Sequence, residues 1–312
     1  MTLRIAYLGP PGTFTYLAAA QLWERTDELL PSTTVPEVID RVRWGDCDFG
    51  VVPVENTVEG IVTASLDQLV FGSGDVVVLR EISVPTTFHV YRATGASGPP
   101  TGIASHPHGL AQCTRYVNAA GLPTRVFQST AAAVEAAAAD PGLLAIAAPD
   151  LAGRYAVSLV DSGIEDHPGV VTRFACLGSR RRQADLPAPD EGLSWKTLLA
   201  LTPATRPGTL ADVCVQFSDQ GVNILSLTSR PLPGFAGAYV FVLALADTRT
   251  SAGLARAVNG LLYTGVRVKF LGSFLSDHLL RPSRPDRPLS APAGSFGLRD
   301  LHEVSAVFPG RP

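Results

Sequence analysis

The sequence is poor in lysine and has no excess of positive charge. Only two of its 25 basic residues are lysines, Lys196 and Lys269, so arginine carries nearly all of the positive charge. The formal net charge is −3, with neither a basic patch nor an acidic tail. This pattern argues against nucleic acid as a partner. Arginine is also the residue that binds carboxylates through two parallel N–H bonds.

Long apolar runs are missing as well. No stretch reaches the roughly 18 residues that a transmembrane helix needs. The first residues, MTLRIAYLGPPGTF, lack the long apolar core and the small-residue cleavage pattern of a signal peptide. We therefore expect a cytoplasmic protein that does not bind membranes.

Cysteine is scarce, and the four cysteines form no CxxC pair. Disulfides and metal sites are poorly supported by such scattered positions, and nothing in the sequence calls for a metal or a cofactor. We expect small buried apolar side chains at Cys47, Cys113, Cys176 and Cys214.

The length and composition of the chain are sufficient for two globular domains. Hydrophobic residues make up 46% of the 312 residues, and a domain averages about 150 residues. Residues 1–180 alternate strand-like and helix-like segments, which indicates an α/β domain around a largely parallel sheet, with a second lobe at about 85–160. The charged and Pro-rich segment 181–194 is typical of a linker. Segment 195–275 has the order β-α-β-β-α-β of a ferredoxin-like unit, and 276–312 has the composition of a poorly ordered tail.

The hydrophobic pattern also predicts individual elements. Strands are expected at 3–9, 49–56, 103–105, 124–127, 143–147, 196–203, 222–231, 238–246 and 266–274, and a strand pair over 76–93. Helices are expected at 13–23, 60–72, 107–121, 129–140, after the strand at 143–147, at 208–221 and at 249–265.

Small polar residues stand where several of these strands give way to helices. They occur in GPPGTFT (9–15), VPVENTVEG (52–60), SHPHGLAQC (105–113) and QSTAAAVEA (128–136). Each group alone is explained by helix capping. Together they indicate a ligand site, because ligands of open α/β sheets bind beyond the carboxyl ends of the strands and helix N-termini favour anions. The sequence therefore indicates a cleft for a small anion between two lobes.

A further stretch, DHPGVVTRFACLG, runs from a loop into an apolar strand at 166–178. It places a hydroxyl and a guanidinium side by side, at Thr172 and Arg173, where the strand begins. A hydroxyl can donate a proton and a guanidinium can bind a carboxylate, so both are candidate site residues.

Five motifs, GPPGTFT, VPVENTVEG, SHPHGLAQC, STAAA and TRF, occur in this order at specific spacing. In them the chain resembles the prephenate dehydratase family, which makes phenylpyruvate on the way to phenylalanine, over residues 4–275. The resemblance implies a two-lobed catalytic domain like the type II periplasmic binding proteins. It also implies that 195–275 is an ACT domain that senses an amino acid, with phenylalanine as the expected effector.

The same resemblance assigns roles to residues. Thr172 would donate to the leaving hydroxyl of prephenate. Arg173 would either balance the charge of the dianion or brace the cleft, and Asn56 and Ser105 would complete the catalytic set. Substrate-binding positions would be Thr13, Phe14, Glu55, Thr57, Gly60, His106, Thr130 and Phe174. Effector-binding positions would be Gly208, Thr209, Leu210, Asn223, Thr228, Ser229, Arg230 and Pro231. Self-association through ACT domains, as a dimer or tetramer, is expected.

Three positions depart from the family pattern. Val170 stands where the family usually has Asn, His108 replaces a Gln, and Thr228 replaces a Glu. Loss of the Glu is expected to weaken sensing of phenylalanine. Three alternatives to a prephenate dehydratase follow: an arogenate dehydratase, a prephenate decarboxylase-type enzyme, or a cytoplasmic sensor without activity. Thr172 and the ACT-like unit favour the dehydratase.

Overall fold

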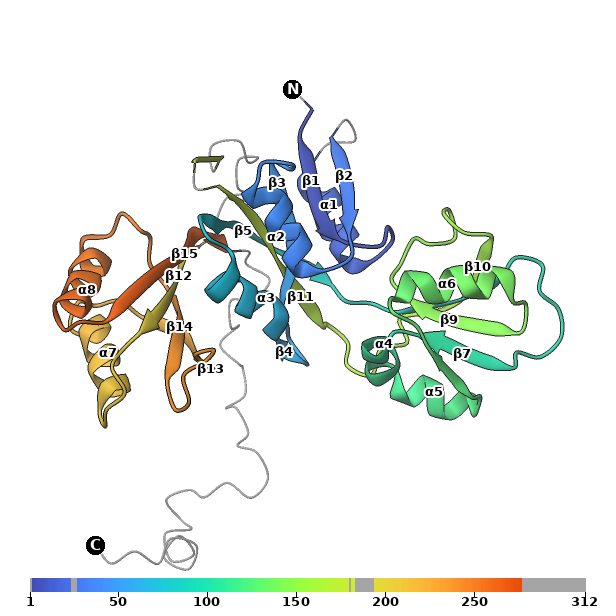
Figure 1. Ribbon diagram of the computed structural model, residues 1–312. Coiled ribbons are helices and arrows are strands. Elements are labelled where there is room, and N and C mark those ends of the chain that lie inside the picture. Colours follow the sequence, from blue (N-terminus) through green and yellow to red (C-terminus); the bar gives the residue numbers. More distant parts are fainter. Residues whose placement is uncertain (1, 24–26, 180, 183–193, 277–312) are drawn as a thin grey trace, which may run out of the picture. The chain divides into compact units, whose positions relative to one another are not determined.

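The computed structural model describes residues 2–23, 27–179, 181–182 and 194–276, in an α/β arrangement with two mixed sheets (Figure 1). Most of the predicted linker and nearly all of the predicted tail lie outside the described residues. None of the helices in the described part has the length and apolarity to span a bilayer.

The first sheet has at its centre strands from both ends of the predicted catalytic part. Strand β11 pairs antiparallel with β3 on one side and with β5 on the other, while β1 pairs parallel with both β2 and β3. These strands are β1 (Arg4–Leu8), β2 (Glu28–Ser32), β3 (Phe49–Asn56), β5 (Val76–Pro85) and β11 (Val171–Ser179). The short β4 (Gly60–Ile61) pairs with β3.

Helices cover both faces of this sheet. Helix α1 (Phe14–Leu22) packs through Ala18, Ala19 and Leu22 against a core that includes Phe174. Helix α2 (Val35–Arg43) buries residues at the spacing i, i+3, i+4 and i+7, the apolar stripe of an amphipathic helix. Helix α3 (Thr63–Asp67) continues directly into the π-helical turn η1 (Gln68–Gly72).

The second sheet has the strand order β10-β6-β9-β7-β8. Helix α6 packs on it through its alanines, and α4 and α5 lie over a separate apolar cluster. The strands are β6 (His89–Ala93), β7 (Gly102–Ser105), β8 (Thr124–Val126), β9 (Leu143–Ala147) and β10 (Val157–Ser162), and the helices are α4 (Pro107–Gln112), α5 (Thr114–Ala120) and α6 (Thr130–Ala139).

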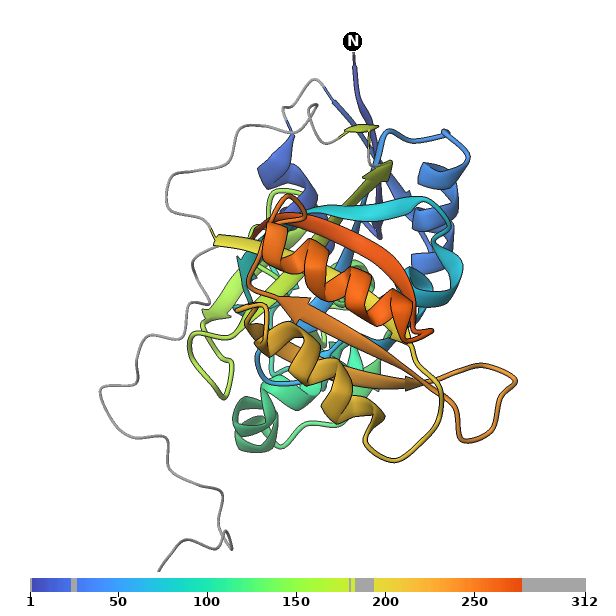
Figure 2. The same cartoon turned by 90° about the vertical axis from the view of Figure 1, so that its left-hand side faces the viewer.

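The C-terminal part has the predicted order β-α-β-β-α-β. Its strands follow one another in space as β13-β14-β12-β15, all antiparallel, and α7 and α8 lie side by side on one face (Figure 2). The elements are β12 (Ser194–Thr202), α7 (Thr209–Ser218), β13 (Ile224–Pro231), β14 (Tyr239–Leu245), α8 (Ala252–Tyr263) and β15 (Arg267–Ser276).

Strand β15 joins this part to the first sheet at a single register position, Gly272 opposite Val78 of β5. A Cβ atom at Gly272 would lie 2.2 Å from the carbonyl oxygen of Val78. The strands can therefore approach only because this residue is glycine.

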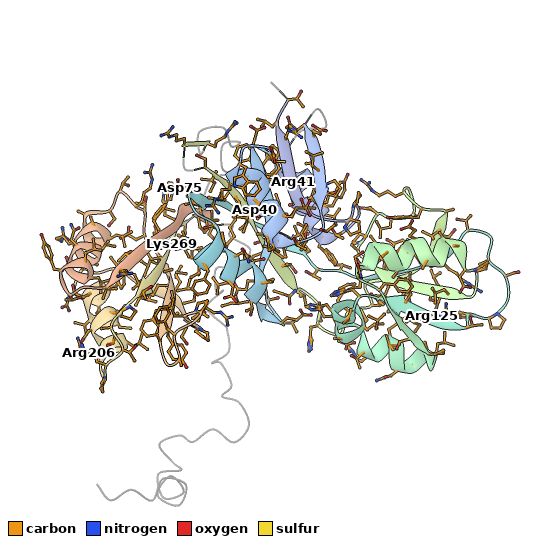
Figure 3. The ribbon with its side chains drawn as sticks, in the orientation of Figure 1. Asp40, Arg41, Asp75, Arg125, Arg206 and Lys269 are labelled. Carbon is orange, nitrogen blue, oxygen red and sulfur yellow. The ribbon has the colours of Figure 1, made fainter. Side chains whose placement is uncertain are left out.

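Both lysines of the sequence connect the C-terminal part to the α/β part before it, Lys196 through strand β5 and Lys269 through η1. Lys196 of β12 is buried and donates to both carboxylate oxygens of Glu81, at 3.0 and 3.1 Å. Lys269 of β15, labelled in Figure 3, donates at 2.9 Å to the carbonyl oxygens of Leu69 and Val70 at the end of α3–η1. A cation is well placed there because helix carbonyls lack partners at a C-terminus.

Several sequence predictions are wrong in detail. The first domain is not built on a largely parallel sheet, because β11 runs antiparallel between β3 and β5 and the second sheet also mixes directions. Segment 76–93 forms two strands, but β5 and β6 belong to different sheets. Residues 148–156, predicted as a helix, form turns, with Asp150 at φ 64°. Cys47, Cys113 and Cys176 are buried as expected, and Cys214 is half-buried.

Candidate functional site

The Thr172 hydroxyl lies in a cavity at the carboxyl-terminal end of β3. Antiparallel pairing of β3 and β11 places Thr172 opposite Asn56, the last residue of β3. The cavity has a volume of about 310 Å³, at the lower end of the range for small-molecule sites. It is lined by residues of both sheets and their helices, so a ligand there would contact both.

Two buried side chains hold the Thr172 hydroxyl. The amide nitrogen of Asn56 donates to Thr172 Oγ1 at 2.9 Å, and Thr86 Oγ1 lies 2.7 Å away on the other side. The orientation of Asn56 is fixed, because its Oδ1 accepts from the backbone N–H groups of Val58 and Glu59 at 2.9 and 3.1 Å. Its nitrogen therefore has to face Thr172.

This arrangement suits a proton donor. Thr172 Oγ1 accepts from Asn56, and when Thr86 also donates to it, its own proton is free for a group in the cavity. Two incoming hydrogen bonds stabilise negative charge on the oxygen, which makes the hydroxyl a better donor. The geometry can thus assist the departure of a poor leaving group such as hydroxide.

Helix starts supply further polar groups to the wall. Thr13 caps α1 by accepting from the Tyr16 N–H at 3.3 Å, and Ser129 caps α6 by accepting from the Ala132 N–H at 3.0 Å. Both residues line the cavity together with Thr130. Helix N-termini favour anions, so these two ends offer positive potential.

Aromatic side chains form the apolar part of the wall. Phe14 and Phe88 meet edge to face, with their ring centroids 5.4 Å apart, and Phe174 is fully buried on the same face of β11 as Thr172. An apolar wall with a few convergent polar groups is typical of small-molecule sites.

A cluster of ionisable groups closes one side. His108 Nδ1 contacts Glu59 Oε2, and Gln112 Nε2 donates to Glu59 Oε1 at 2.7 Å. His106 Nδ1 accepts from the backbone N–H of His108 at 3.3 Å. Burial lowers the pKa of His106, and the neighbouring His108 lowers it further against the opposing effect of Glu59. The neutral ring of His106 then carries its proton on Nε2.

Arg173 does not line this cavity. Side chains alternate along β11, so Arg173 lies on the opposite face from Thr172, where its Nη1 binds Glu55 Oε2 at 2.8 Å. Glu55 lines a different cavity, which it shares with buried Lys196 and with Thr228 of β13. The predicted charge balance to a dianion by Arg173 therefore has no counterpart at the Thr172 cavity.

Three other predicted residues also lie outside it. Ser105 is fully buried, and its hydroxyl donates to the carbonyl of Ile146 at 2.7 Å. The Thr57 hydroxyl accepts from the Val171 N–H at 3.1 Å, which fixes the start of β11 next to Thr172. Gly60 forms the turn into β4 with φ 83°. The structure brings together Thr172, Asn56, Thr13, Phe14, His106, Thr130 and Phe174.

The predicted effector residues fall into separate places. Gly208, Thr209 and Leu210 line a cavity beside Tyr239 and Phe241 of β14. Thr228 lines the cavity of Glu55 instead, and Arg230 makes two hydrogen bonds of 2.6 and 2.7 Å to Asp67 of α3. The backbone carbonyl of Asn223 accepts from the Ala246 N–H, and Ser229 and Pro231 lie on β13.

Sequence reasoning missed several lining residues. Two lie outside the motifs, Thr86 and Phe88, and the motifs contain the others, Glu59, His108, Gln112, Gln128 and Ser129. The sequence around Thr86 contains a pattern that could have identified it as a site residue. It stands in the polar pair Thr86–Thr87 just after β5, the same pattern that marked the other candidate groups.

The described residues contain no group of three or more His, Cys, Asp or Glu side chains that could hold a metal ion. What they offer is a hydroxyl donor, capped helix ends and an imidazole–carboxylate cluster around one cavity.

Several known prephenate dehydratases are similar to this chain. The family model described as prephenate dehydratase matches residues 5–182. A prephenate dehydratase of Amycolatopsis methanolica is 35% identical over 273 residues, covering 87% of this chain and 88% of its own. One from Lactococcus lactis subsp. cremoris is 32% identical, covering 87% and 97%. The crystal structure of the Arthrobacter aurescens prephenate dehydratase in complex with L-Phe has a TM-score of 0.76 at 29% identity, covering 99% of this chain and 100% of that one.

The family model covers more than half of the chain, and it spans β3 and β11, the strands that carry Asn56 and Thr172. The chain therefore belongs to the prephenate dehydratase family, whose members are lyases.

Proposed function

We propose that the cavity around Thr172 converts prephenate to phenylpyruvate, CO2 and water, with Thr172 as the proton donor. The observation that carries this proposal is the position of the Thr172 hydroxyl between Asn56 and Thr86, at 2.9 and 2.7 Å, in a cavity of small-molecule size.

The chemistry needs little more than such a donor. The bond between the ring and its carboxylate breaks, its electron pair enters the ring, and the C–O bond to the hydroxyl breaks on the far side of the ring. Aromatisation drives this rearrangement. The leaving hydroxide takes up a proton and departs as water, and solvent returns the proton to Thr172. A positioned donor is worth about 10²–10⁴ in rate.

Binding of the substrate is assigned to the remaining wall. The ends of α1 and α6, with Thr13 and Thr130, would receive the carboxylates, because helix N-termini favour anions. Phe14, Phe88 and Phe174 would pack against the ring. The cavity lies between two α/β units joined by the segments that connect β5 to β6 and β10 to β11, which fits a two-lobed binding-protein-like domain.

The test is turnover of prephenate by Thr172→Val, which keeps the branched shape and removes the hydroxyl. Thr172→Ser is the matched control, because it keeps the hydroxyl and removes the methyl group. Phenylpyruvate is followed by its ultraviolet absorbance. We expect kcat to fall about 10²–10⁴-fold for Val and far less for Ser. CO2 release without phenylpyruvate would instead identify a decarboxylase, and binding without turnover a sensor.

The C-terminal part is assigned as an ACT domain that binds phenylalanine. Its element order and strand order fit such a unit, and the cavity at Gly208, Thr209 and Leu210 has the apolar neighbours Tyr239 and Phe241. The Arthrobacter aurescens relative is a complex with L-Phe. We expect phenylalanine to inhibit turnover, and no effect at millimolar concentration would contradict this assignment.

We propose self-association through this part, which is supported by its exposed apolar side chains. Leu210, Val215, Leu225 and Tyr239 are large apolar side chains that are at least 40% exposed. Such residues would be covered by a second copy of the chain, as a dimer or tetramer.

A further inference from the structure

The cluster of Glu59, His106 and His108 has no part in the proton transfer proposed above. These three are the only ionisable side chains that line the cavity in the described part of the chain, where no lysine or arginine lines it. The net charge of the wall therefore depends on this cluster alone.

Glu59 is held from two directions. His108 Nδ1 pairs with one of its oxygens and Gln112 Nε2 donates to the other at 2.7 Å. The Gln112 amide donates a hydrogen bond but has no charge. Only His108, once protonated, can cancel the negative charge of Glu59.

His106 is not suited to this task. Its Nδ1 already accepts a hydrogen bond from the His108 backbone, and burial lowers its pKa, so it stays neutral above pH 6.5. The two rings lie with their centroids 4.9 Å apart, and two imidazolium ions at that distance would repel each other.

The net charge of the wall matters because the proposed substrate is a dianion. With His108 neutral, Glu59 gives the wall a charge of −1, which repels two carboxylates. With His108 protonated the wall is neutral, and the helix ends can attract the substrate without opposition. An analogue that carries an ammonium group, as arogenate does in place of the keto oxygen, has a net charge of −1 instead of −2 and would therefore respond more weakly.

We propose that His108 is a specificity-determining residue, whose imidazolium neutralises Glu59 and so favours prephenate over arogenate. This inference rests on the proposed function. It goes beyond the proton transfer because it concerns the charge of the ligand that the cavity accepts.

The experiment measures kcat and KM of the full-length chain for prephenate and for arogenate between pH 5.5 and 8.5. Histidine ordinarily ionises at about pH 6.5. We expect KM for prephenate to rise about threefold to tenfold across this range. We expect the change in KM to be no larger than this because the His108 side chain is 64% exposed and water screens its charge.

His108→Gln should keep the hydrogen bond to Glu59 and lose the charge. We expect its KM for prephenate to stay at the high-pH value throughout, with the loss mainly in KM rather than in kcat. Its ratio of kcat/KM for arogenate to that for prephenate should rise about threefold to tenfold at pH 6. Glu59→Gln tests the same pair from the other side, with a lower KM for prephenate at pH 8.

His167→Gln is the matched control, because His167 is exposed and does not line the cavity. It should retain the pH dependence of the wild type. A pH-independent KM in the wild type, or an unchanged pH dependence in His108→Gln, would overturn the inference while leaving the dehydratase intact. Absence of phenylpyruvate at every pH would instead refute the proposed function.

Discussion

Replacement of Thr86 by Val tests whether the hydrogen bonds around Thr172 matter for the reaction. Thr86 is 4% exposed, and its Oγ1 lies 2.7 Å from Thr172 Oγ1. Valine keeps the branched shape and removes one hydrogen bond, which is worth about 1 kcal/mol. If that bond is formed fully only as charge develops on Thr172, kcat should fall about threefold to tenfold.

The assay is phenylpyruvate formation at saturating prephenate, with Thr86→Ser as the control that keeps the hydroxyl. The fold should be retained, because the change in volume is small, and the thermal midpoint checks this. The reasoning predicts a loss well below that of Thr172→Val. A Thr86→Val enzyme with wild-type kcat would refute the support role, and a loss as large as that of Thr172→Val would show that Thr86 is itself the donor.

Two predictions concern stability. Lys196→Met should lower the free energy of unfolding by about 3–5 kcal/mol, because among the described residues it leaves the buried Glu81 carboxylate with only the Ser276 hydroxyl as a side-chain partner. Lys196→Met combined with Glu81→Leu should recover much of this loss. Urea unfolding measures both, and a double variant no more stable than the single one would contradict the argument. Burial raises the pKa of Tyr7 to about 12, whereas an unfolded tyrosine ionises near 10. The contribution of protonated Tyr7 to the free energy of unfolding is therefore complete below pH 10 and is lost as pH rises towards 12, by about 2–3 kcal/mol in total. In unfolding experiments at pH 9–11, Tyr7→Phe should lose less of this free energy than the wild type. Equal losses would disprove the assignment.

Local pattern was enough to locate most elements of the fold. Alternating polar and apolar residues, capping threonines and β-branched runs are local signals, and β3, α6 and the six elements of the C-terminal part lie where these signals placed them. Strand direction is not a local signal. Nothing within 171–179 indicates that β11 runs antiparallel between β3 and β5, because that depends on pairing with residues far away in the sequence, such as Val171 with Pro85 and Thr172 with Asn56.

The prediction of the site likewise succeeded where the signal was local and failed where it depended on the fold. Thr172 and Asn56 were each predicted as catalytic residues through motifs, and pairing of β3 with β11 brings them together. Arg173 was placed with them because it is adjacent in sequence, but neighbours in a strand face opposite sides, so it lies on the other face beside Glu55. Thr86 was missed because no motif contains it, and only the fold brings the end of β5 to Thr172.

The position of the two lysines gives the protein a built-in chemical reporter. Lys196 and Lys269 are the only side-chain amines in the sequence. Both bind groups of the preceding α/β part, Lys196 the Glu81 carboxylate and Lys269 the carbonyls of η1. Acylating reagents that react with free amines should therefore modify these side chains slowly, and only when that junction opens. The rate of acylation at each lysine, read by mass spectrometry with and without phenylalanine, would report how often the two parts separate, without any engineered label.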